Sequence, residues 1–409
     1  MSAEDSILPV PAAPAVPAVP AGEPAGEPAG GGVSGPLTHP VPMPASAQSP
    51  TQTRSAVAAA AAAVMATASV RPAAAAASSV RRLAVLHETR YRYDAAVEVA
   101  HHGAWLRPRE TPVQRVLGWR LDIDPVPDAT VQHSRDAFGN WRQGFSHAQV
   151  HDRLLVRSRF DVTVSPPPPL DVEASPPWTE VAAGLRYRAG CQQPEAVEFV
   201  LGSRFAPQHP QLALFAADLL AQRRARPLLD LGLALMHRVH AHMRYRPATT
   251  DVATDALQAL ARAEGVCQDY AHLMIGVWRS LGLAARYVSG YLLTQPPTGQ
   301  ARLIGADASH AWVALWCPLH GWVALDPTND LRVGQDHVTL AWGRDYADVA
   351  PLRGVIRGGG NAPPQVAVSV VPADDAQAML ALGPLDAPVQ AMAAGAAGAA
   401  GAAGAALSD

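Results

Sequence analysis

The chain has 409 residues, with 32 basic and 35 acidic side chains, a formal net charge of −3 and no lysine. This length is enough for two or three domains and for a sizeable buried core. Near-neutral charge and a charged fraction of only 16% argue against a nucleic-acid-binding protein, which would carry a basic stripe. No stretch of about 18 or more strongly apolar residues occurs, so we expect no transmembrane helix and no membrane partner.

The three cysteines, Cys191, Cys267 and Cys317, are widely spaced and contain no CxxC pair. They predict neither a disulfide framework nor a zinc ribbon, and a reducing compartment is the simpler interpretation. The acidic start of the chain lacks a basic segment followed by an apolar one, so it does not have the pattern of a secretory signal. We therefore expect a cytoplasmic protein, and we expect neither a metal site nor a cofactor.

Both ends of the chain are low in sequence complexity. Residues 1–80 are rich in Pro, Ala and Gly and contain few groups to bury, so we expect most of them to be disordered. Residues 351–409 form a C-terminal extension, in which repeated Gly-Ala-Ala units from Gly395 onward predict a flexible tail. We expect the two low-complexity ends to be dispensable for chemistry.

Residues 81–165 have the pattern of short strands. Residues 83–87, 117–123 and 153–164 are short strand-like runs rich in apolar residues, and the second half of the last alternates apolar and polar side chains at a period of two. The pattern predicts a small β-rich domain, either a sandwich or a partly open barrel. Four consecutive prolines follow at 166–169 and mark a linker or a domain edge.

Residues 178–350 begin with helical patterns and end with strands, which makes the whole chain α+β. Thr254 and Asp255 offer N-cap oxygens to a helix that we expect to end at Gly265. Leu273, Val277 and Leu281 are spaced four apart, so a further helix of about four turns is predicted to begin close to Cys267.

Cys267 therefore stands at a predicted helix N-terminus. A thiol in this position faces unpaired backbone N–H groups and the positive end of the helix dipole, and both favour the thiolate. Gly265, two residues earlier, leaves open access to the sulfur. The alternative is a buried apolar cysteine, which is the usual state of this residue and the one that we expect for Cys191 and Cys317.

A predicted hairpin carries two further candidate residues, His310 and Asp326. Its strands are joined by a five-residue turn, and their odd positions are aliphatic while their even positions are polar or aromatic. If Trp316 opposes Trp322, then Asp326 is a diagonal neighbour of His310 on the same face and within its reach. Asp326 then accepts from one imidazole nitrogen while the other faces a substrate or Cys267, the logic of a catalytic triad with sulfur as the nucleophile.

Each of these assignments has a structural alternative. His310 alone is as well explained by an exposed or hydrogen-bonded strand histidine, and Asp326 before Pro327 is also a typical start of a turn. The three tryptophans of the hairpin, Trp312, Trp316 and Trp322, suit core packing and the wall of a substrate groove equally well. The combination of the three candidates, rather than any one of them, favours a catalytic site.

Four motifs together resemble the bacterial transglutaminase-like proteins. They are Gly265-Val-Cys-Gln-Asp-Tyr-Ala-His-Leu, Ala285-Arg-Tyr-Val-Ser-Gly-Tyr, Ser309-His-Ala-Trp-Val and Gly321-Trp-Val-Ala-Leu-Asp-Pro-Thr-Asn. In the β-rich region, His87-Glu-Thr-Arg-Tyr-Arg-Tyr and Asp136-Ala-Phe-Gly-Asn resemble the N-terminal domain that accompanies the bacterial members. The resemblance covers about residues 83–360 and implies a papain-like transglutaminase core after the β-rich domain.

The resemblance implies Cys267 as nucleophile, His310 as general base and acid, and Asp326 as the residue that orients the imidazole. The expected reaction is acyl transfer from an amide of a peptide or protein through a thioester, which makes the chain a cysteine peptidase or amidase, or a transamidase. A non-catalytic binding module on the same fold is the alternative from another class. The sequence chooses neither the substrate nor the acceptor.

Alkylation by iodoacetamide at mildly acidic pH tests the predicted thiolate. We expect Cys267 to be modified selectively over Cys191 and Cys317, because only Cys267 is expected at a helix N-terminus. Peptide mapping by mass spectrometry measures the modification of each cysteine. Equally slow modification of all three would favour the binding module.

Overall fold

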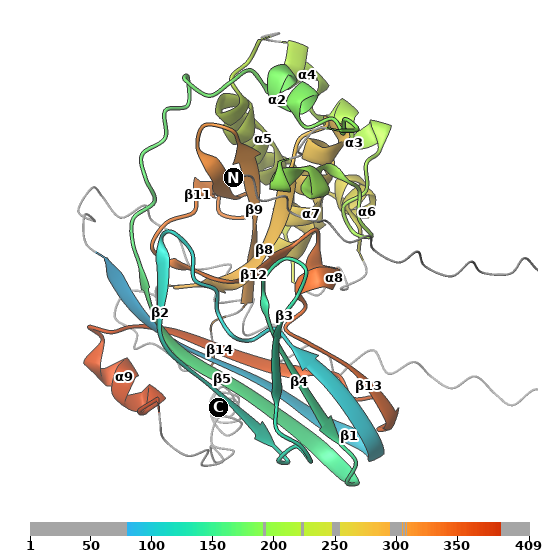
Figure 1. The fold of residues 1–409 in the computed structure, drawn as a ribbon, viewed down its shortest axis with the longest axis vertical. Coiled ribbons are helices and arrows are strands. Elements are labelled where there is room, and N and C mark those ends of the chain that lie inside the picture. The colour runs from blue at the N-terminus through green and yellow to red at the C-terminus, as the bar shows by residue number, and fades with distance from the viewer. Residues whose placement is uncertain are drawn as a thin grey trace, which may run out of the picture. The chain divides into compact units, whose positions relative to one another are not determined.

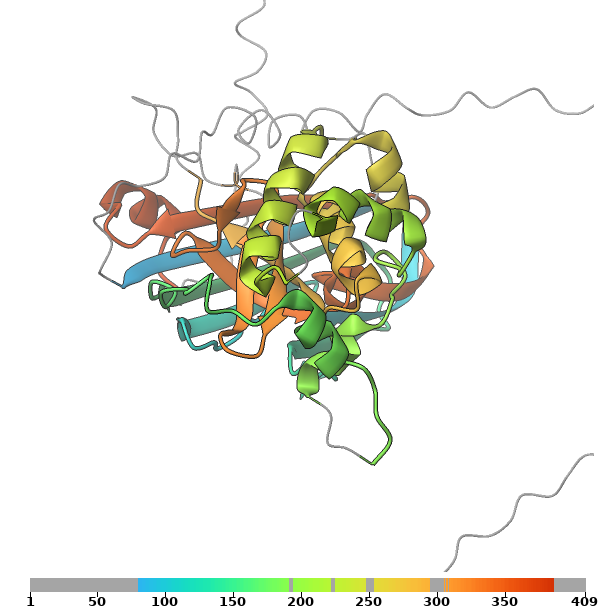
Figure 2. The ribbon, with the colours of Figure 1, turned by 90° about the horizontal axis from the view of Figure 1, so that it is seen from above.

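A computed structural model describes residues 80–190, 194–221, 225–247, 254–294, 305, 307 and 309–385. The segment predicted to be disordered at 1–80, except its last residue, the Gly-Ala-Ala tail and Cys191 lie outside the described residues. Strands and helices both contribute to the fold, which confirms the α+β class. Figures 1 and 2 show the described elements from two directions, with α2 to α7 grouped together and α9 apart from them beside β14.

The N-terminal half is organised around one long strand, β1 (Arg81–Ala104), which belongs to a seven-stranded antiparallel sheet. The first half of β1 pairs with β5 (His151–Val164) and its second half with β4 (Trp141–His147). Outside these, β2 (Gln114–Asp124) pairs with β5 and β3 (Gln132–Arg135) pairs with β4. These strands contain the three apolar runs that the sequence analysis identified.

The described part of the C-terminal extension returns to this sheet. β13 (Leu352–Gly358) and β14 (Gln365–Pro372) both pair with β1, and the short helix α9 (Ala376–Leu382) follows them. Residues 351–409 are expected to form an extension, and these strands were not predicted in it. The run Val-Ala-Val-Ser-Val-Val at 366–371 is rich in β-branched residues, the signal that identifies a strand there.

The expected sandwich or partly open barrel does not form, because the second layer comes from the other half of the chain. Apolar side chains on one face of the N-terminal sheet, among them Val85 and Phe160, share a buried cluster with Tyr291 and Val338. Periodicity predicted that the sheet has an apolar face, but it carried no information about what covers that face. The two halves therefore have a core in common.

Tyr291 and Val338 belong to the second, five-stranded sheet, whose order is β11-β10-β9-β8-β12. Its strands are β8 (Ala285–Leu292), β9 (Ser309–Cys317), β10 (Gly321–Asp326), β11 (Leu331–Arg332) and β12 (His337–Gly343). The helical elements are α2 (Trp178–Gly184), η1 (Glu195–Val200), α3 (Pro210–Phe215), α4 (Ala217–Ala221), α5 (Leu228–His242), α6 (Ala256–Arg262), α7 (Cys267–Ser280) and α8 (Tyr346–Val349). A short parallel pair joins β6 (Arg244–Tyr245) and β7 (Glu264–Gly265).

The predicted helix boundaries are close to those of the structure. Asp255 caps α6 through its side chain, as expected. However, α6 ends at Arg262, and its C-cap residue Ala263 adopts a left-handed conformation with a φ of 53°. Gly265 therefore does not end the helix. It instead makes room for Asp269, because a Cβ at Gly265 would collide with the Asp269 carboxylate. The 14 residues of α7 begin at Cys267, which confirms the predicted start and length.

The register of the hairpin formed by β9 and β10 is also as predicted. Trp322 lies opposite Trp316, and the ladder continues to Leu325 opposite Val313. The odd-numbered aliphatic side chains of both strands belong to the core shared with α5 and α7. This register places His310 and Asp326 on the same, opposite face of the hairpin.

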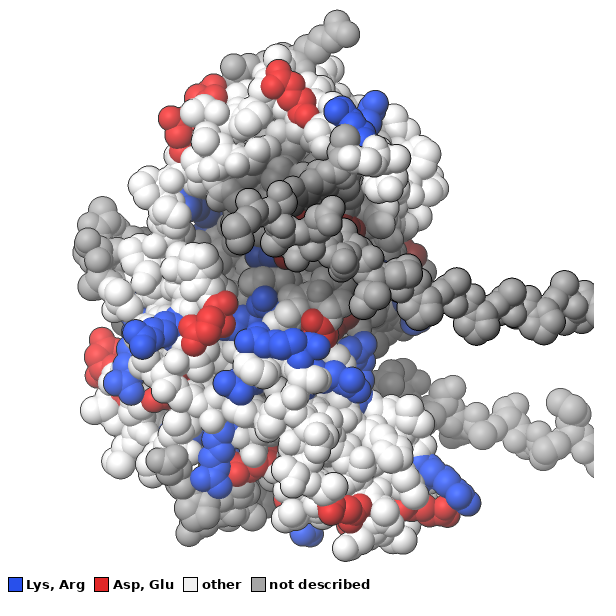
Figure 3. Space-filling model, viewed as in Figure 1, with Lys and Arg blue, Asp and Glu red and all other residues white. Residues whose placement is uncertain are grey.

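The arginines of the lysine-free chain often stack on tryptophan. On the face shown in Figure 3, arginine side chains gather in a band across the middle, interspersed with acidic ones. The guanidinium carbons of Arg107 and Arg135 lie 4.0 and 3.6 Å from the ring centroid of Trp141. The guanidinium carbon of Arg353 lies 3.9 Å from the ring centroid of Trp105. Such cation–π contacts contribute about 0.5–1 kcal/mol each at exposed sites.

Among the described helices, none is long and apolar enough to cross a membrane.

Replacing Gly290 by alanine tests the packing behind His310. Gly290 pairs with His310 across β8 and β9, and a Cβ there would collide with the carbonyl oxygen of Val338 and lie 2.5 Å from the Trp312 ring. We expect Gly290→Ala to lower the free energy of unfolding in urea by about 2–3 kcal/mol. The control is Gly184→Ala at the end of α2, where no atom lies within 4 Å of the added methyl group and little change is expected. Equal stability of the two variants would contradict the packing.

Candidate functional site

The structure brings the three candidate residues together from three elements. Cys267 is the first residue of α7, His310 lies at the start of β9, and Asp326 is the last residue of β10. Cys267 and His310 line one cavity of about 330 Å³. The Nε2 atom of His310 lies 2.7 Å from Oδ2 of Asp326, and both side chains are fully buried.

The charge state of His310 is set by its two neighbours. Burial alone would lower the pKa of His310, but the charge and the hydrogen bond of Asp326 outweigh burial. A hydrogen bond and the charge of Cys267 act in the same direction, and together they raise the pKa of His310 to about 10. At neutral pH the ring is therefore an imidazolium. Its Nδ1 atom is buried and makes no hydrogen bond of standard geometry with any described residue.

The start of α7 holds Cys267 at the cavity. The backbone N–H of Val266, the N-cap residue, donates to Oδ2 of Asp269 at 2.8 Å, which fixes the first turn of the helix. Cys267 is half-buried and lines the cavity, whereas Cys317 is fully buried in the apolar core. The two described cysteines therefore match the two environments that the sequence analysis assigned to them.

The carboxylate of Asp326 accepts hydrogen bonds from five donor groups. Besides His310, Oδ2 accepts from Nδ2 of Asn329 at 2.7 Å and from Nε2 of His337 at 3.2 Å. Oδ1 accepts from the backbone N–H groups of Thr328 and Asn329 at 3.0 and 3.2 Å. Burial by itself would raise the pKa of Asp326, but His310 and His337 hold it well below its usual range. Asp326 is therefore a fixed negative charge.

Sequence reasoning missed the contributions of Asn329 and His337. Asn329 is part of the Asp-Pro-Thr-Asn motif, so its proximity to Asp326 was available as a signal. His337 begins β12, which is not a neighbour of β10 in the sheet, and no spacing rule connects the two. The Nδ1 atom of His337 accepts from the backbone N–H of Gly334 at 3.4 Å, so Nε2 carries the proton that is donated to Asp326.

His310, Asp326 and His337 are the one group of potential metal ligands found among the described residues. Ligand atoms of His310, Asp326 and His337 all lie within 4.8 Å of one another. Two histidines and a carboxylate are a donor set that transition metals accept. However, the separations of 2.7 and 3.2 Å are hydrogen-bond distances, and an ion would have to replace both bonds. The geometry therefore favours a hydrogen-bonded network that positions His310.

Both halves of the chain build the cavity at Cys267. From the second half, Tyr245 and Tyr287 line the cavity. Burial is the main cause that raises the pKa of both phenols, and the charge of Cys267 adds to it, so both phenols stay protonated and can donate hydrogen bonds. From the first sheet and its C-terminal strands come His87, Thr89, Tyr91, Leu352 and Val366. The N-terminal sheet is therefore part of the wall that a substrate would meet.

The hairpin tryptophans do not line this cavity. Trp312 is buried with Val288 and Ala314 in a separate cluster, against which Trp322 packs. Trp322 lines a different cavity, and Trp316 packs against the core shared with α7. Of the two interpretations left open for these rings, core packing describes Trp312, and none of the three forms the wall next to Cys267.

Comparison with known proteins identifies relatives along most of the chain. The sequence profile of the bacterial transglutaminase-like N-terminal region matches residues 83–163, and that of the transglutaminase-like superfamily matches residues 218–327. Uncharacterised proteins of Mycobacterium tuberculosis and Mycobacterium bovis are each 39% identical over 303 residues, which cover 72% of this chain and 94% of theirs. A protein-glutamine gamma-glutamyltransferase of Pseudomonas aeruginosa is 34% identical over 144 residues, 33% of this chain and 21% of that protein.

A solved structure shares the fold. A candidate cysteine protease from Cytophaga hutchinsonii superposes with a TM-score of 0.56 at 18% sequence identity, over 73% of this chain and 92% of that protein. At this identity the likeness concerns the fold alone. It extends over both halves of the chain, because neither half by itself accounts for 73% of the residues.

The buried pair makes stability depend on pH in a defined way. The pKa of His310 is raised from 6.5 to about 10, so its stabilisation is complete below pH 6.5 and is lost as the pH rises toward 10. The lowered pKa of Asp326 gives stabilisation that is complete above pH 3.8 and is lost in acid. We expect the free energy of unfolding in urea to fall between pH 6.5 and 10, and Asp326→Asn to abolish this fall. The same alkaline slope in both proteins would contradict the ion pair.

Proposed function

Because the chain belongs to the transglutaminase-like superfamily, with the N-terminal region of its bacterial members, we propose that it is an acyl-transfer enzyme that acts on amides through Cys267. The observation that carries the proposal is the buried bond between His310 and Asp326 at a cavity that Cys267 also lines. The proposed substrate is an amide of a peptide or protein.

In the first half of the proposed reaction, Cys267 forms a thioester. The thiolate sulfur attacks the carbonyl carbon, a C–S bond forms, and the carbonyl oxygen becomes an oxyanion. The backbone N–H of Cys267 is one donor to this oxyanion, as expected at a helix N-terminus. Collapse of the intermediate breaks the C–N bond, and the His310 imidazolium gives its proton to the departing amine.

In the second half, an acceptor resolves the thioester. Neutral His310 removes a proton from water or from an amine, the acceptor attacks the carbonyl carbon, and the C–S bond breaks. The thiolate and the imidazolium are thereby restored. Water gives a carboxylic acid, and an amine gives a new amide. Because the chain contains no lysine, a lysine acceptor would have to belong to another molecule.

Asp326 has the role of orienting His310 in this mechanism. Its Oδ2 holds Nε2 of the ring, which leaves Nδ1 for the proton exchanged with sulfur and substrate. The positive charge that Asp326 maintains on His310 lies at the cavity that Cys267 also lines. The proposal includes a cytoplasmic location, which rests on the sequence alone.

A non-catalytic module that binds peptides in the same cavity is the second candidate, supported by the wall that the N-terminal sheet contributes.

Incubation with glutamine-containing peptides, with and without a primary amine, tests the activity. We expect the wild-type protein to release ammonia or cleave a peptide bond, and Cys267→Ala to be slower by roughly 10³-fold or more, because the nucleophile is absent. Mass spectrometry distinguishes the products: hydrolysis of a glutamine side chain replaces ammonia with water, transamidation replaces ammonia with the amine, and peptidase activity divides the peptide into two fragments that together contain one added water. The matched control is Cys317→Ala, which removes a cysteine outside the cavity and is expected to retain activity.

Two results would contradict the proposal. Equal rates for wild type and Cys267→Ala would exclude Cys267 as the nucleophile. Peptide binding without any product, in a protein whose Cys267 also resists alkylation, would favour the binding module. Circular dichroism and thermal unfolding of both variants establish that a lost activity does not reflect a lost fold.

A further inference from the structure

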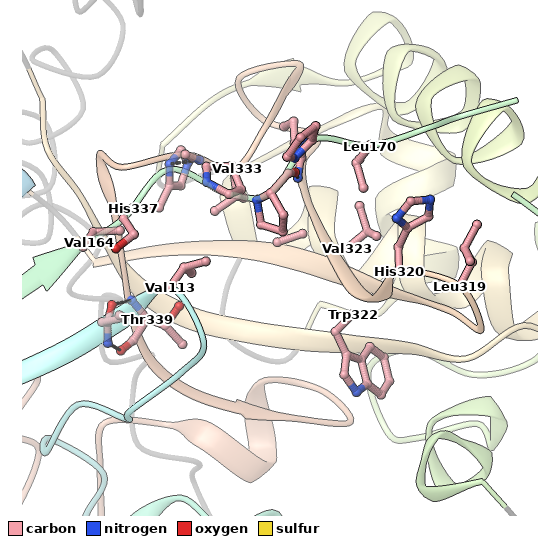
Figure 4. A pocket seen from close by; sticks show the side chains of 18 residues that line it. Val113, Val164, Leu170, Leu319, His320, Trp322, Val323, Val333, His337 and Thr339 are labelled. Atoms are coloured by element: carbon pink, nitrogen blue, oxygen red, sulfur yellow. Dashed lines mark hydrogen bonds between the residues drawn. The ribbon is translucent and has the colours of Figure 1, made fainter. Parts of the chain in front are cut away.

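A second cavity, of about 340 Å³, shares no lining residue with the cavity at Cys267. It lies between the proline-rich segment 165–170 and the strands β10 to β12, and Figure 4 shows its side chains. Aliphatic side chains of Val113, Leu170, Leu319 and Val333 form much of its wall. Its volume falls in the range of small-molecule sites, which are mostly apolar with a few placed polar groups.

Among the described residues, hydrogen-bond donors but no carboxylates line this cavity. No Asp or Glu is among its lining residues, whereas Arg332, His320 and His337 are. Arg332 donates one N–H to the carbonyl oxygen of Pro168 at 2.5 Å and forms no ion pair with any described residue. Burial lowers the pKa of Arg332, and no carboxylate offsets this effect. A partly buried guanidinium without a counter-ion favours an anion, above all a planar carboxylate that it can bind through two N–H groups.

His337 connects this cavity to the cavity at Cys267. It lines the second cavity, and its Nε2 donates to the same Asp326 oxygen that holds His310. Its ring centroid lies 6.1 Å from that of His310. A ligand at His337 is therefore separated from the imidazole beside Cys267 by a single shared carboxylate.

We propose that the second cavity binds a small monocarboxylic acid with an apolar body and that this ligand weakens the hold of Asp326 on His310. Arg332 would pair with the carboxylate, and the aliphatic wall would cover the body. The carboxylate also favours a proton on His337. A protonated His337 competes with His310 for the charge of Asp326, so His310 becomes less basic. The regulatory consequence rests on the proposed function, whereas binding and its effect on His310 do not.

The other charged groups around His337 are consistent with this direction. Asp326 and His310 face it from β10 and β9, and Arg332 lines the same cavity. Asp336 precedes His337 in the chain but is paired with Arg81 of β1. Among the described groups, Asp326 is thus the acidic side chain bonded to His337, and the ligand would supply a second one.

Binding is tested with 3-phenylpropionate and its uncharged analogue 3-phenylpropanamide by calorimetry on the full chain. We expect the acid to bind at least about tenfold more tightly than the amide, and Arg332→Gln to remove this preference. The control is Arg357→Gln on β13, whose side chain is 79% exposed, and which is expected to bind the acid as the wild type does. Equal binding of acid and amide, or no loss in Arg332→Gln, would overturn the carboxylate site.

The coupling is tested by NMR titration of histidine rings in ¹⁵N-labelled protein, with His310→Gln used to assign the His310 signal. We expect saturating 3-phenylpropionate to lower the pKa of His310 by about half a unit or more, and His337→Gln to abolish this shift. An unchanged His310 titration in the bound protein would overturn the regulatory link. Neither the calorimetry nor the NMR titration requires turnover. A protein without activity would therefore contradict the proposed function, whereas binding of the acid and its effect on His310 would still be measured.

Discussion

The buried negative charge of Asp326 is the constraint on which the rest of the site depends. An isolated carboxylate at such depth would cost several kcal/mol, so its stability requires a full set of donors. These donors come from β9, from the turn after β10 and from the start of β12. Segments that are separate in the chain are thereby held against the two carboxylate oxygens of Asp326. The orientation of His310 follows because Asp326 is itself held in place by these other donors.

The packing of the two halves of the chain against each other depends on a second requirement, the burial of an apolar face. The N-terminal sheet has an apolar face that needs a cover, and β8 and β12 provide it. β8 also pairs with β9 of the β9–β10 hairpin, and β12 pairs with the other edge of β8, so the packed sheet and the hairpin belong to one continuous arrangement. A buried bond between the Tyr291 hydroxyl and Nδ1 of His87, at 3.0 Å, adds direction to this otherwise non-directional contact. The sheet is therefore a structural part of the cavity at Cys267.

Local patterns in the sequence predicted the elements that local physics determines. The start of α7, the capping of α6 by Asp255 and the register of Trp316 with Trp322 each depend on nearby residues, and each is found in the structure. His337 was missed because its contact with Asp326 is made by the packing of β12, which no periodicity encodes. The strands β13 and β14 were missed for a similar reason, since their partner β1 lies more than two hundred residues earlier.

The pairing of β14 with β1 has a consequence for biosynthesis. Leu83, near the start of β1, lies opposite Pro372, so this edge of the sheet joins residues from the two ends of the described chain. A nascent polypeptide cannot form that pairing until the segment after the β9–β10 hairpin has emerged from the ribosome, and pairings so distant in sequence form slowly. Val366 and Leu352, which line the cavity at Cys267, emerge after every residue of the proposed triad. The cavity at Cys267 is thus complete only after residues 352–366 have been translated, later than all three residues of the proposed triad.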